Sequence, residues 1–181
     1  MKILFLAAVD FELAVARSLA GAENCRFVCS GMGPEATRTA LSAALAQERF
    51  DLAVDLGVAG SYDSHLFPVG SVVQVVTERM GDRPERLLLN PQPPQAFAAL
   101  PQAAGHTVPA LDDRFRTAAS DVETMEGAAF FEVCLASGVP FAEIRAVSNA
   151  VGEQDRSLWN IPLALRNLQA CLQKLASPLL K

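Results

Sequence analysis

The sequence lacks any long apolar run and any excess of basic residues. No uninterrupted apolar stretch in the 181 residues reaches the roughly 18 residues that a membrane-spanning helix needs. The formal net charge is −5, and no basic stripe is present that could follow a phosphate backbone. These absences argue against a membrane-spanning protein and against a nucleic-acid binder, and they favour a small-molecule partner.

Paired cysteines and a secretion signal are missing as well. The four cysteines form no C-x-x-C motif and no paired spacing: Cys25, Cys29, Cys134 and Cys171. We therefore expect buried, reduced thiols in a cytoplasmic protein. The apolar residues 1–9 resemble the start of a signal peptide, but Asp10 and Glu12 interrupt the stretch. We interpret this stretch as a buried first strand.

The remaining composition is that of a packed globular protein. Apolar residues make up 51% of the chain and charged residues 19%, which excludes a disordered chain. There are no internal repeats, linkers or low-complexity tracts. A chain of this length fits one domain that buries about 70% of its unfolded surface. We therefore predict a single domain over residues 1–181.

Strand and helix patterns alternate along most of the chain. Apolar runs bounded by turn residues predict strands at residues 2–8, 26–30, 51–55, 70–77 and 141–149. Helical patterns cover residues 11–19, 34–48 and 125–137, and a last helix follows Asn160, which is placed to cap it. Asp10 is the expected N-cap of the first helix, and Pro34 opens the second. The alternation predicts a three-layer α/β/α fold with a mainly parallel, mixed sheet.

The middle of the chain carries a weaker signal. Six prolines interrupt residues 78–120, and only residues 86–89 and 106–108 suggest strands there. Two glycine-rich segments, residues 31–33 and 57–60, are predicted as turns that follow strands.

Polar residues gather where the predicted strands end. Five residues lie at carboxyl ends of strands: Glu12, Ser30, Gly57, Ser148 and Asn149. Glu126 lies close by, at the start of a helix. In open α/β sheets ligands bind outside the carboxyl ends of the strands, so we expect these residues to surround one ligand. An acid, a ribose acceptor and a donor to a leaving base suit cleavage of an N-glycosidic bond, which passes through an oxocarbenium-like state.

Each of these residues also has a purely structural interpretation. Glu12 is well placed to interact favourably with a helix dipole, and Glu126 could cap its helix instead of accepting the hydroxyls of a ribose. The glycines allow close approach of backbone to a ligand or simply form tight turns. A dinucleotide site is a further alternative, because Gly31-x-Gly33-x-x-Ala36 fits that fingerprint and Asp55 follows about twenty residues later. Pro34 removes one amide from that helix start, so a nucleoside site is favoured.

Five short segments resemble the superfamily of purine nucleoside phosphorylases and nucleosidases. They are AVDFE (residues 8–12), SGMG (30–33), GVAG (57–60), VETMEGAA (122–129) and IRAVSN (144–149). The Ser148-Asn149 pair, together with residues 155–162, is similar to the futalosine hydrolase branch. The resemblance implies a nucleoside phosphorylase-like fold and hydrolysis of a hypoxanthine nucleoside such as futalosine, a step in menaquinone biosynthesis. It also implies a homo-oligomer that needs no cofactor or metal.

By this resemblance the site residues divide into two groups. Glu12 would activate water, Arg145 would hold that water or else only pair with a carboxylate, and Asn149 would act on the leaving base. The sugar and base would contact Ser30, Gly31, Gly57, Met125, Glu126 and Ser148. Methylthioadenosine nucleosidases carry Asp at the position of Asn149. A neutral amide can donate to O6 and N7 of a 6-oxopurine, so Asn149 favours hypoxanthine over adenine.

Two further questions concern the reaction and its alternatives. Asp55 and Glu12 would give the site a negative edge that repels phosphate, so we predict hydrolysis and not phosphorolysis. A nucleosidase for methylthioadenosine or adenosylhomocysteine and a purine nucleoside phosphorylase are the enzymatic alternatives. The segment between Thr77 and Val122 is short for the superfamily, which leaves a noncatalytic nucleoside-binding protein as the alternative of another class.

Overall fold

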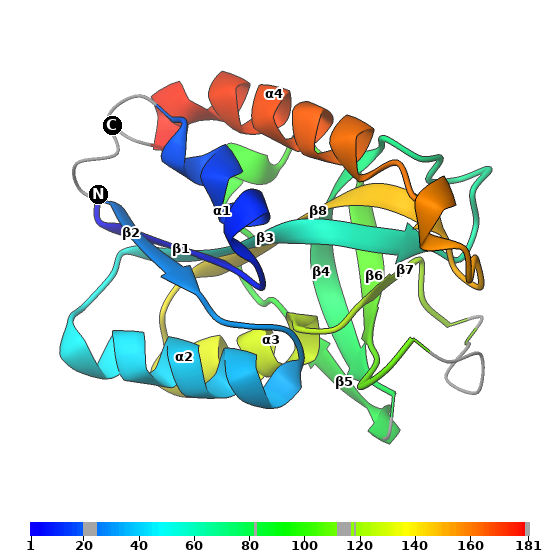
Figure 1. Ribbon diagram of the computed structural model, residues 1–181. Helices are drawn as coiled ribbons and strands as arrows, with labels where there is room; N and C mark the ends of the chain where they lie inside the picture. Colours follow the sequence, from blue (N-terminus) through cyan, green and yellow to red (C-terminus); the bar gives the residue numbers. More distant parts are fainter. Residues whose placement is uncertain (20–24, 82, 112–116, 118, 180–181) are drawn as a thin grey trace.

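The computed structural model describes residues 1–19, 25–81, 83–111, 117 and 119–179, which build one eight-stranded sheet with helices on both faces (Figure 1). The strands are β1 (Ile3–Ala7), β2 (Cys25–Cys29), β3 (Leu52–Ser61), β4 (Val72–Met80), β5 (Arg83–Leu89), β6 (Gln102–Thr107), β7 (Val122–Thr124) and β8 (Phe141–Ala150). The helices are α1 (Asp10–Arg17), α2 (Pro34–Gln47), α3 (Gly127–Ser137) and α4 (Ile161–Leu179), with short 3₁₀ turns η2 (Gln95–Phe97) and η4 (Arg156–Leu158).

The sheet is mixed and partly closed on itself. Its order is β2-β1-β3-β7-β6-β4-β5, and β8 pairs with both β3 and β4. Pairs β1–β2, β1–β3, β3–β8, β4–β6 and β6–β7 are parallel, whereas β3–β7, β4–β5 and β4–β8 are antiparallel. The mainly parallel sheet was predicted. The closed ring β3-β8-β4-β6-β7 was not predicted, because β7 is too short to give a sequence signal.

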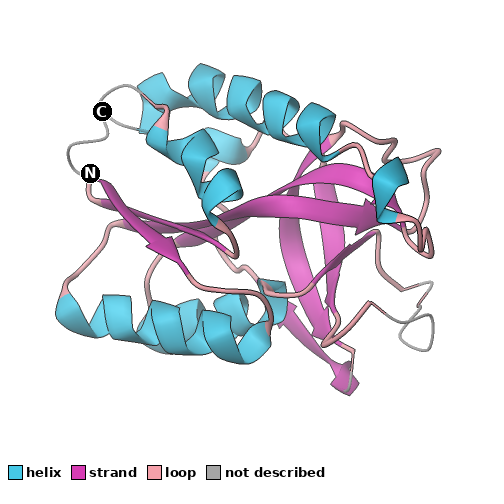
Figure 2. Cartoon of the chain, in the orientation of Figure 1, coloured by secondary structure: helices cyan, strands magenta, loops and turns pink. Residues whose placement is uncertain are grey.

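Two apolar cores lie on the two faces of the sheet. Ile3 and Phe5 of β1 belong to the core under α1 and α4, whereas Leu4 and Leu6 belong to the core under α2 and α3. This division follows from the alternation of side chains along a strand. The helices α1 and α4 lie on one side of the sheet and α2 and α3 on the other, as the cartoon also shows (Figure 2). The three-layer prediction is therefore confirmed.

The ends of several helices follow their sequence signals. Pro34 lies in the first turn of α2, directly after Gly33 with φ +93°. Gly138 ends α3 with φ +68°, the left-handed conformation that glycine adopts most readily. Asn160 Oδ1 accepts a hydrogen bond from Leu163 N at 3.2 Å, so this predicted cap is confirmed. Asp10 is not a cap, because it lies inside α1.

The segment 57–60 was wrongly predicted as a turn. It continues β3, because β8 runs beside it and pairs from Ala53↔Phe141 to Ser61↔Ala150. A neighbouring strand thus supplies the hydrogen bonds that keep these glycines extended. The cysteine prediction is partly wrong as well, since Cys134 is buried but Cys29 is exposed. In the described part of the chain, no helix is both long enough and apolar enough to cross a membrane.

Candidate active site

Arg145 lies at the centre of a group of buried carboxylates. It is 1% exposed on β8, and its Nε donates to Glu143 Oε1 at 2.8 Å while Nη2 donates to Asp55. Nη1 lies 3.9 Å from Glu126 Oε2. Burial lowers the pKa of Arg145, but the surrounding carboxylates more than offset this, and the pKa is raised overall. Arg145 is therefore a fixed positive charge.

Gly57 lets Glu12 approach Arg145 from the far side of β3. The register places Gly57 opposite Arg145. A Cβ atom at Gly57 would lie 2.8 Å from Glu12 Oε1 and closer still to Arg145 Nη1. A side chain at this position would displace Glu12 or Arg145, so glycine is needed here for their close packing and not for a turn.

Glu12 offers one free carboxylate oxygen at this point. It is 5% exposed on α1, and its Oε1 accepts a hydrogen bond from Val58 N at 2.9 Å. Its Oε2 is buried and has no hydrogen-bond partner among the described residues. Burial raises the pKa of Glu12, against the opposing effects of Arg145 and the Val58 amide. A buried acceptor of this kind is suited to hold and deprotonate a water molecule.

Glu126 joins the starts of two helices to this centre. It is the N-cap residue of α3, one position before the helix begins and not in its first turn as predicted, and it is 6% exposed. Its Oε1 accepts from Gly33 N at 3.0 Å, where α2 begins, and its Oε2 faces Arg145. The neighbouring Ser30 and Met125 are half-buried. Ser30 Oγ donates to the carbonyl oxygen of Gly31 at 2.8 Å.

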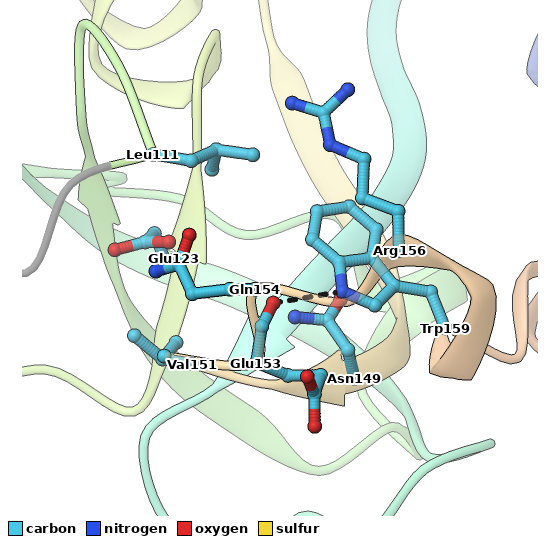
Figure 3. A pocket seen from close by; sticks show the side chains of 9 residues that line it. Leu111, Glu123, Asn149, Val151, Glu153, Gln154, Arg156 and Trp159 are labelled. Carbon is cyan, nitrogen blue, oxygen red and sulfur yellow. Dashed lines mark hydrogen bonds between the residues drawn. The ribbon is translucent and has the colours of Figure 1, made fainter.

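Asn149 lines a pocket four residues further along β8. Its Oδ1 accepts from Ser148 Oγ at 2.7 Å, and its Nδ2 donates to Ala150 O at 2.9 Å, which fixes the amide and leaves it a second N–H. The pocket is shown in Figure 3. Its other lining residues are Leu111, Glu123, Val151, Gly152, Glu153, Gln154, Arg156 and Trp159.

The structure thus places the predicted residues in two neighbouring groups along the β3–β8 pair. Glu12, Gly57, Glu126 and Arg145 form the buried group, whereas Ser148 and Asn149 belong to the pocket side. Glu12 and Glu126 do not line the pocket beside Asn149. On β3, Gly57 faces Arg145 and Gly60 faces Asn149, so both groups lie towards the carboxyl ends of the same two strands.

Two interpretations of Asp55 are corrected by this geometry. Asp55 is fully buried and bonded to Arg145, so it is not part of an open negative edge. Because it is bonded to Arg145, Asp55 is also not available to bind the ribose of a dinucleotide. The amide of Gly33, where a pyrophosphate would bind, already donates to Glu126. The dinucleotide alternative therefore finds no support.

Several residues of the site were not predicted. Glu143 lies two positions before Arg145 on the same face of β8, and this i, i+2 spacing was the available signal. Glu123 accepts from Tyr62 Oη at 2.9 Å, and Tyr62 Oη lies 2.8 Å from His106 Nδ1. Burial lowers the pKa of His106, and Arg79 lowers it further. These contacts join the residue that follows β3 to β6 and β7, and the pairing of these strands could not be read from the sequence.

Part of the sequence matches a known family. Residues 102–180 match the model of the Phosphorylase superfamily. A futalosine hydrolase of Streptomyces coelicolor is 35% identical over 113 residues, which cover 62% of this chain and 43% of that protein. A futalosine hydrolase of Thermus thermophilus is 45% identical over 56 residues, 31% of this chain and 25% of that protein. The matched segments therefore span less than half of either relative.

Solved structures share the fold over almost the whole chain. A 5′-methylthioadenosine/S-adenosylhomocysteine nucleosidase from Colwellia psychrerythraea, in complex with adenine, superposes with a TM-score of 0.83 at 18% identity, covering 98% of this chain and 95% of that one. The corresponding nucleosidase from Helicobacter pylori, with butyl-thio-DADMe-Immucillin-A, gives 0.83 at 15% identity and covers 98% of both chains. The predicted nucleoside phosphorylase-like fold is thereby confirmed. The chain thus shares the fold of these nucleosidases, and its residues 102–180 match the Phosphorylase superfamily model.

Proposed function

We propose that the protein hydrolyses the N-glycosidic bond of a 6-oxopurine nucleoside, and that futalosine is its substrate. The products would be hypoxanthine and dehypoxanthine futalosine. The observation that carries this proposal is the free, buried Oε2 of Glu12 beside Arg145 and Glu126. The similarity to futalosine hydrolases over part of the chain supports the choice of substrate.

The buried group supplies the parts that hydrolysis requires. A water held by Glu12 Oε2 attacks C1′ of the ribose and gives its proton to Glu12, while the bond from C1′ to the base breaks and its electrons leave with the base. Glu126, next to Arg145, accepts hydrogen bonds from the ribose hydroxyls. Because Arg145 is held by Asp55 and Glu143, it keeps the acids in place without moving during the reaction. No step of this scheme needs a cofactor.

The pocket beside Asn149 supports an oxopurine as the leaving base. Asn149 can donate a hydrogen bond through its amide, whereas Glu123 brings a carboxylate acceptor to the same pocket. A 6-oxopurine offers acceptors at O6 and N7 and a donor at N1–H, which complements this pair. Adenine keeps the acceptor at N7 but has a donor amino group in place of O6 and an acceptor at N1, so the contacts to O6 and N1 would be reversed. The pocket therefore fits hypoxanthine better than adenine.

The charge of the buried group favours water over phosphate as the nucleophile. Four carboxyl groups contact or approach one guanidinium, namely Glu12, Asp55, Glu126 and Glu143. Asp55 contributes a buried negative charge to this group and does not form an open negative edge. A phosphate dianion would enter a region where acids outnumber the cation, which costs electrostatic energy. We therefore expect free sugar as the product and not sugar 1-phosphate.

The decisive experiment measures base release from several nucleosides. Purified protein is incubated with futalosine, inosine or methylthioadenosine, each with and without phosphate, and the bases and sugars are separated by chromatography. We expect hypoxanthine from futalosine without phosphate. Sugar 1-phosphate formed only in the presence of phosphate would identify a phosphorylase, and adenine released from methylthioadenosine alone would identify the other nucleosidase.

A matched variant distinguishes an enzyme from a noncatalytic binder. Glu12→Gln keeps the acceptor oxygen for Val58 N but cannot take a proton from water. It should lose turnover while binding futalosine as tightly as the wild type in calorimetry. Binding without turnover in the wild type itself would leave only the binding function.

We further infer a homo-oligomer that works in the cytoplasm. Large apolar side chains are exposed at Phe11 (52%), Met32 (70%) and Leu66 (59%), and exposed apolar surface of this kind favours association. The free thiol of the exposed Cys29 suits a reducing compartment. Light scattering during size-exclusion chromatography measures the oligomeric state directly.

A further inference from the structure

A second pair of acids, Glu78 and Glu143, meets beneath the proposed catalytic group. Both side chains are 0% exposed. A Cβ atom at Gly127 would lie 2.6 and 2.7 Å from the two carboxylate oxygens of Glu143 and would also collide with Glu78 Oε1. The two carboxyl groups therefore converge on the first residue of α3. A Cβ at Gly105 would collide with Glu78 as well, so two glycines make room for this pair.

A β-bulge in β4 directs Glu78 towards Glu143. Val75 is the register partner of Glu143 on β8, so these two side chains share a face of the sheet. Simple alternation would put Glu78, three residues later, on the opposite face. The pairing of β4 with β6 shifts between Val75 and Thr77, and this extra residue returns Glu78 to the face of Val75.

The hydrogen bonds around the pair lack one donor. Glu78 Oε2 accepts from Thr107 Oγ1 at 2.9 Å, and Thr107 Oγ1 in turn accepts from Ala128 N at 2.7 Å in the first turn of α3. Glu143 Oε1 accepts from Arg145 Nε. Glu143 Oε2 is buried without a donor among the described residues. A proton on the facing carboxyl group of Glu78 would supply that donor.

The charge balance requires such a proton. Four buried carboxyl groups contact or approach the guanidinium of Arg145, and Glu78, which lies beside Glu143, is a fifth buried carboxyl group in the same region. Two facing carboxylates at zero exposure cannot both be ionised without a large cost. Burial raises the pKa of Glu143, but Arg145 opposes that rise through direct contact. Burial also raises the pKa of Glu78, well above its usual range, and the charge of Glu143 raises it further.

We propose that Glu78 and Glu143 share one proton, carried mainly by Glu78, and that this pair positions the catalytic group. Glu143 holds Arg145 through Nε, while Glu78 holds the start of α3 through Thr107 and thereby places Glu126. Both are positioning residues, since neither reaches the substrate. The positioning role of this pair rests on the proposed function, whereas the shared proton is inferred from the geometry alone.

Loss of this proton at alkaline pH should disturb the site. The groups that face the pair are Asp55 on β3, Arg145 on β8, Glu126 before α3 and the hydroxyls of Thr107 and Thr124. All the titratable groups among them except Arg145 are acids. A second negative charge at Glu78 therefore repels its neighbours and weakens the contact that places Glu126. We expect kcat to fall on the alkaline side.

Nuclear magnetic resonance of protein with ¹³C-labelled glutamate carboxyls tests the proton itself. At pH 7 we expect one glutamate signal with the chemical shift of a protonated acid, and Glu78→Gln should remove it. The absence of such a signal in the wild type, or its persistence in Glu78→Gln, would overturn the proposal. The measurement needs no substrate, so it is independent of the proposed reaction, and absence of the signal in the wild type overturns the proposal even if Glu78→Gln does not fold.

Kinetics test the positioning role through a comparison of variants. Glu78→Gln mimics the protonated acid, so it should keep most of kcat at pH 7 and lose the alkaline fall. Glu78→Ala and Glu143→Gln should each lower kcat at least tenfold with a smaller change in KM. Glu132→Gln is the matched control, because Glu132 lies on α3 but bonds to Arg38 and Arg86 at the surface. Equal losses in Glu78→Gln and Glu78→Ala, or an unchanged alkaline fall in Glu78→Gln, would refute the role.

Discussion

Replacement of Gly57 by alanine tests whether Glu12 and Arg145 must approach each other across β3. Gly57 is not among the glycines with positive φ, so alanine can adopt its backbone conformation. The whole effect then comes from one methyl group. That group would lie 2.8 Å from Glu12 Oε1 and closer to Arg145 Nη1, well inside van der Waals contact. Because Arg145 is held by Asp55 and Glu143, we expect Glu12 to be displaced.

The expected loss of stability is modest and the expected loss of activity is large. Overpacking costs about 1–3 kcal/mol, and the reduced freedom of alanine in the unfolded chain offsets about 0.4–1 kcal/mol of that. The net loss is about 1–2 kcal/mol in the free energy of unfolding, which leaves the protein folded. If Glu12 is the general base, its displacement by about 1 Å should lower kcat/KM by about 10²-fold.

Urea unfolding and base release from futalosine measure these two effects. Gly138→Ala is the matched control, since Gly138 has φ +68° and a Cβ atom there would meet no atom within 4 Å. Alanine in that left-handed conformation costs about 1–2 kcal/mol without touching the site. If Gly57→Ala retained kcat/KM within about threefold of Gly138→Ala, close approach of Glu12 and Arg145 would be unnecessary and the role of Glu12 would fall.

The other predictions concern recognition of the purine base and the role of Glu12 as the proposed general base. Asn149→Asp should weaken cleavage of hypoxanthine nucleosides more than it weakens sugar binding, and equal losses in kcat and in affinity for a ribose analogue would count against base recognition. Glu123→Gln should reduce the preference for inosine over adenosine, as measured by the ratio of their kcat/KM values; an unchanged ratio would remove Glu123 from the base site. Because burial raises the pKa of Glu12, the acidic fall of kcat/KM should begin at a higher pH than for an exposed glutamate. The same shift penalises the folded state as pH rises above about 4.5, so Glu12→Gln should be more stable than wild type at pH 7 but not at pH 4.

Much of the fold and part of the site could be predicted, because the relevant signals are local. The helix α2 begins at Pro34, α4 follows the cap Asn160, and β8 is a single apolar run with Arg145 in it. Glu12 and Glu126 were identified because each follows a strand or starts a helix at the edge where ligands bind. Periodicity and capping depend on neighbours in sequence, so the sequence alone reveals them.

The features that escaped prediction depend on partners distant in sequence. The segment 57–60 looked like a turn, yet β8 and the side chains of Glu12 and Arg145 determine that glycine is needed there. Glu78 was not singled out, because only the bulge in β4 turns it towards Glu143. Asp55 was noticed as a negative charge, but its burial against Arg145 appears only once β3 and β8 are paired.

The buried carboxyl groups outnumber the buried cation, and this excess bears both on the choice of water as nucleophile and on the proton shared by Glu78 and Glu143. A single guanidinium cannot balance five carboxyl groups in a region without solvent, and breaking a buried ion pair costs about 3–5 kcal/mol. We propose that the imbalance is relieved by two protons: Glu78 keeps one, and Glu12, whose pKa is raised by burial, takes one from water during the reaction. Each proton removes one negative charge from the buried group, whereas a bound phosphate would add negative charge to it. We therefore expect water and not phosphate as the nucleophile, and a variant with an added cation, such as Val58→Arg, should not gain phosphorolysis unless the acids are also removed.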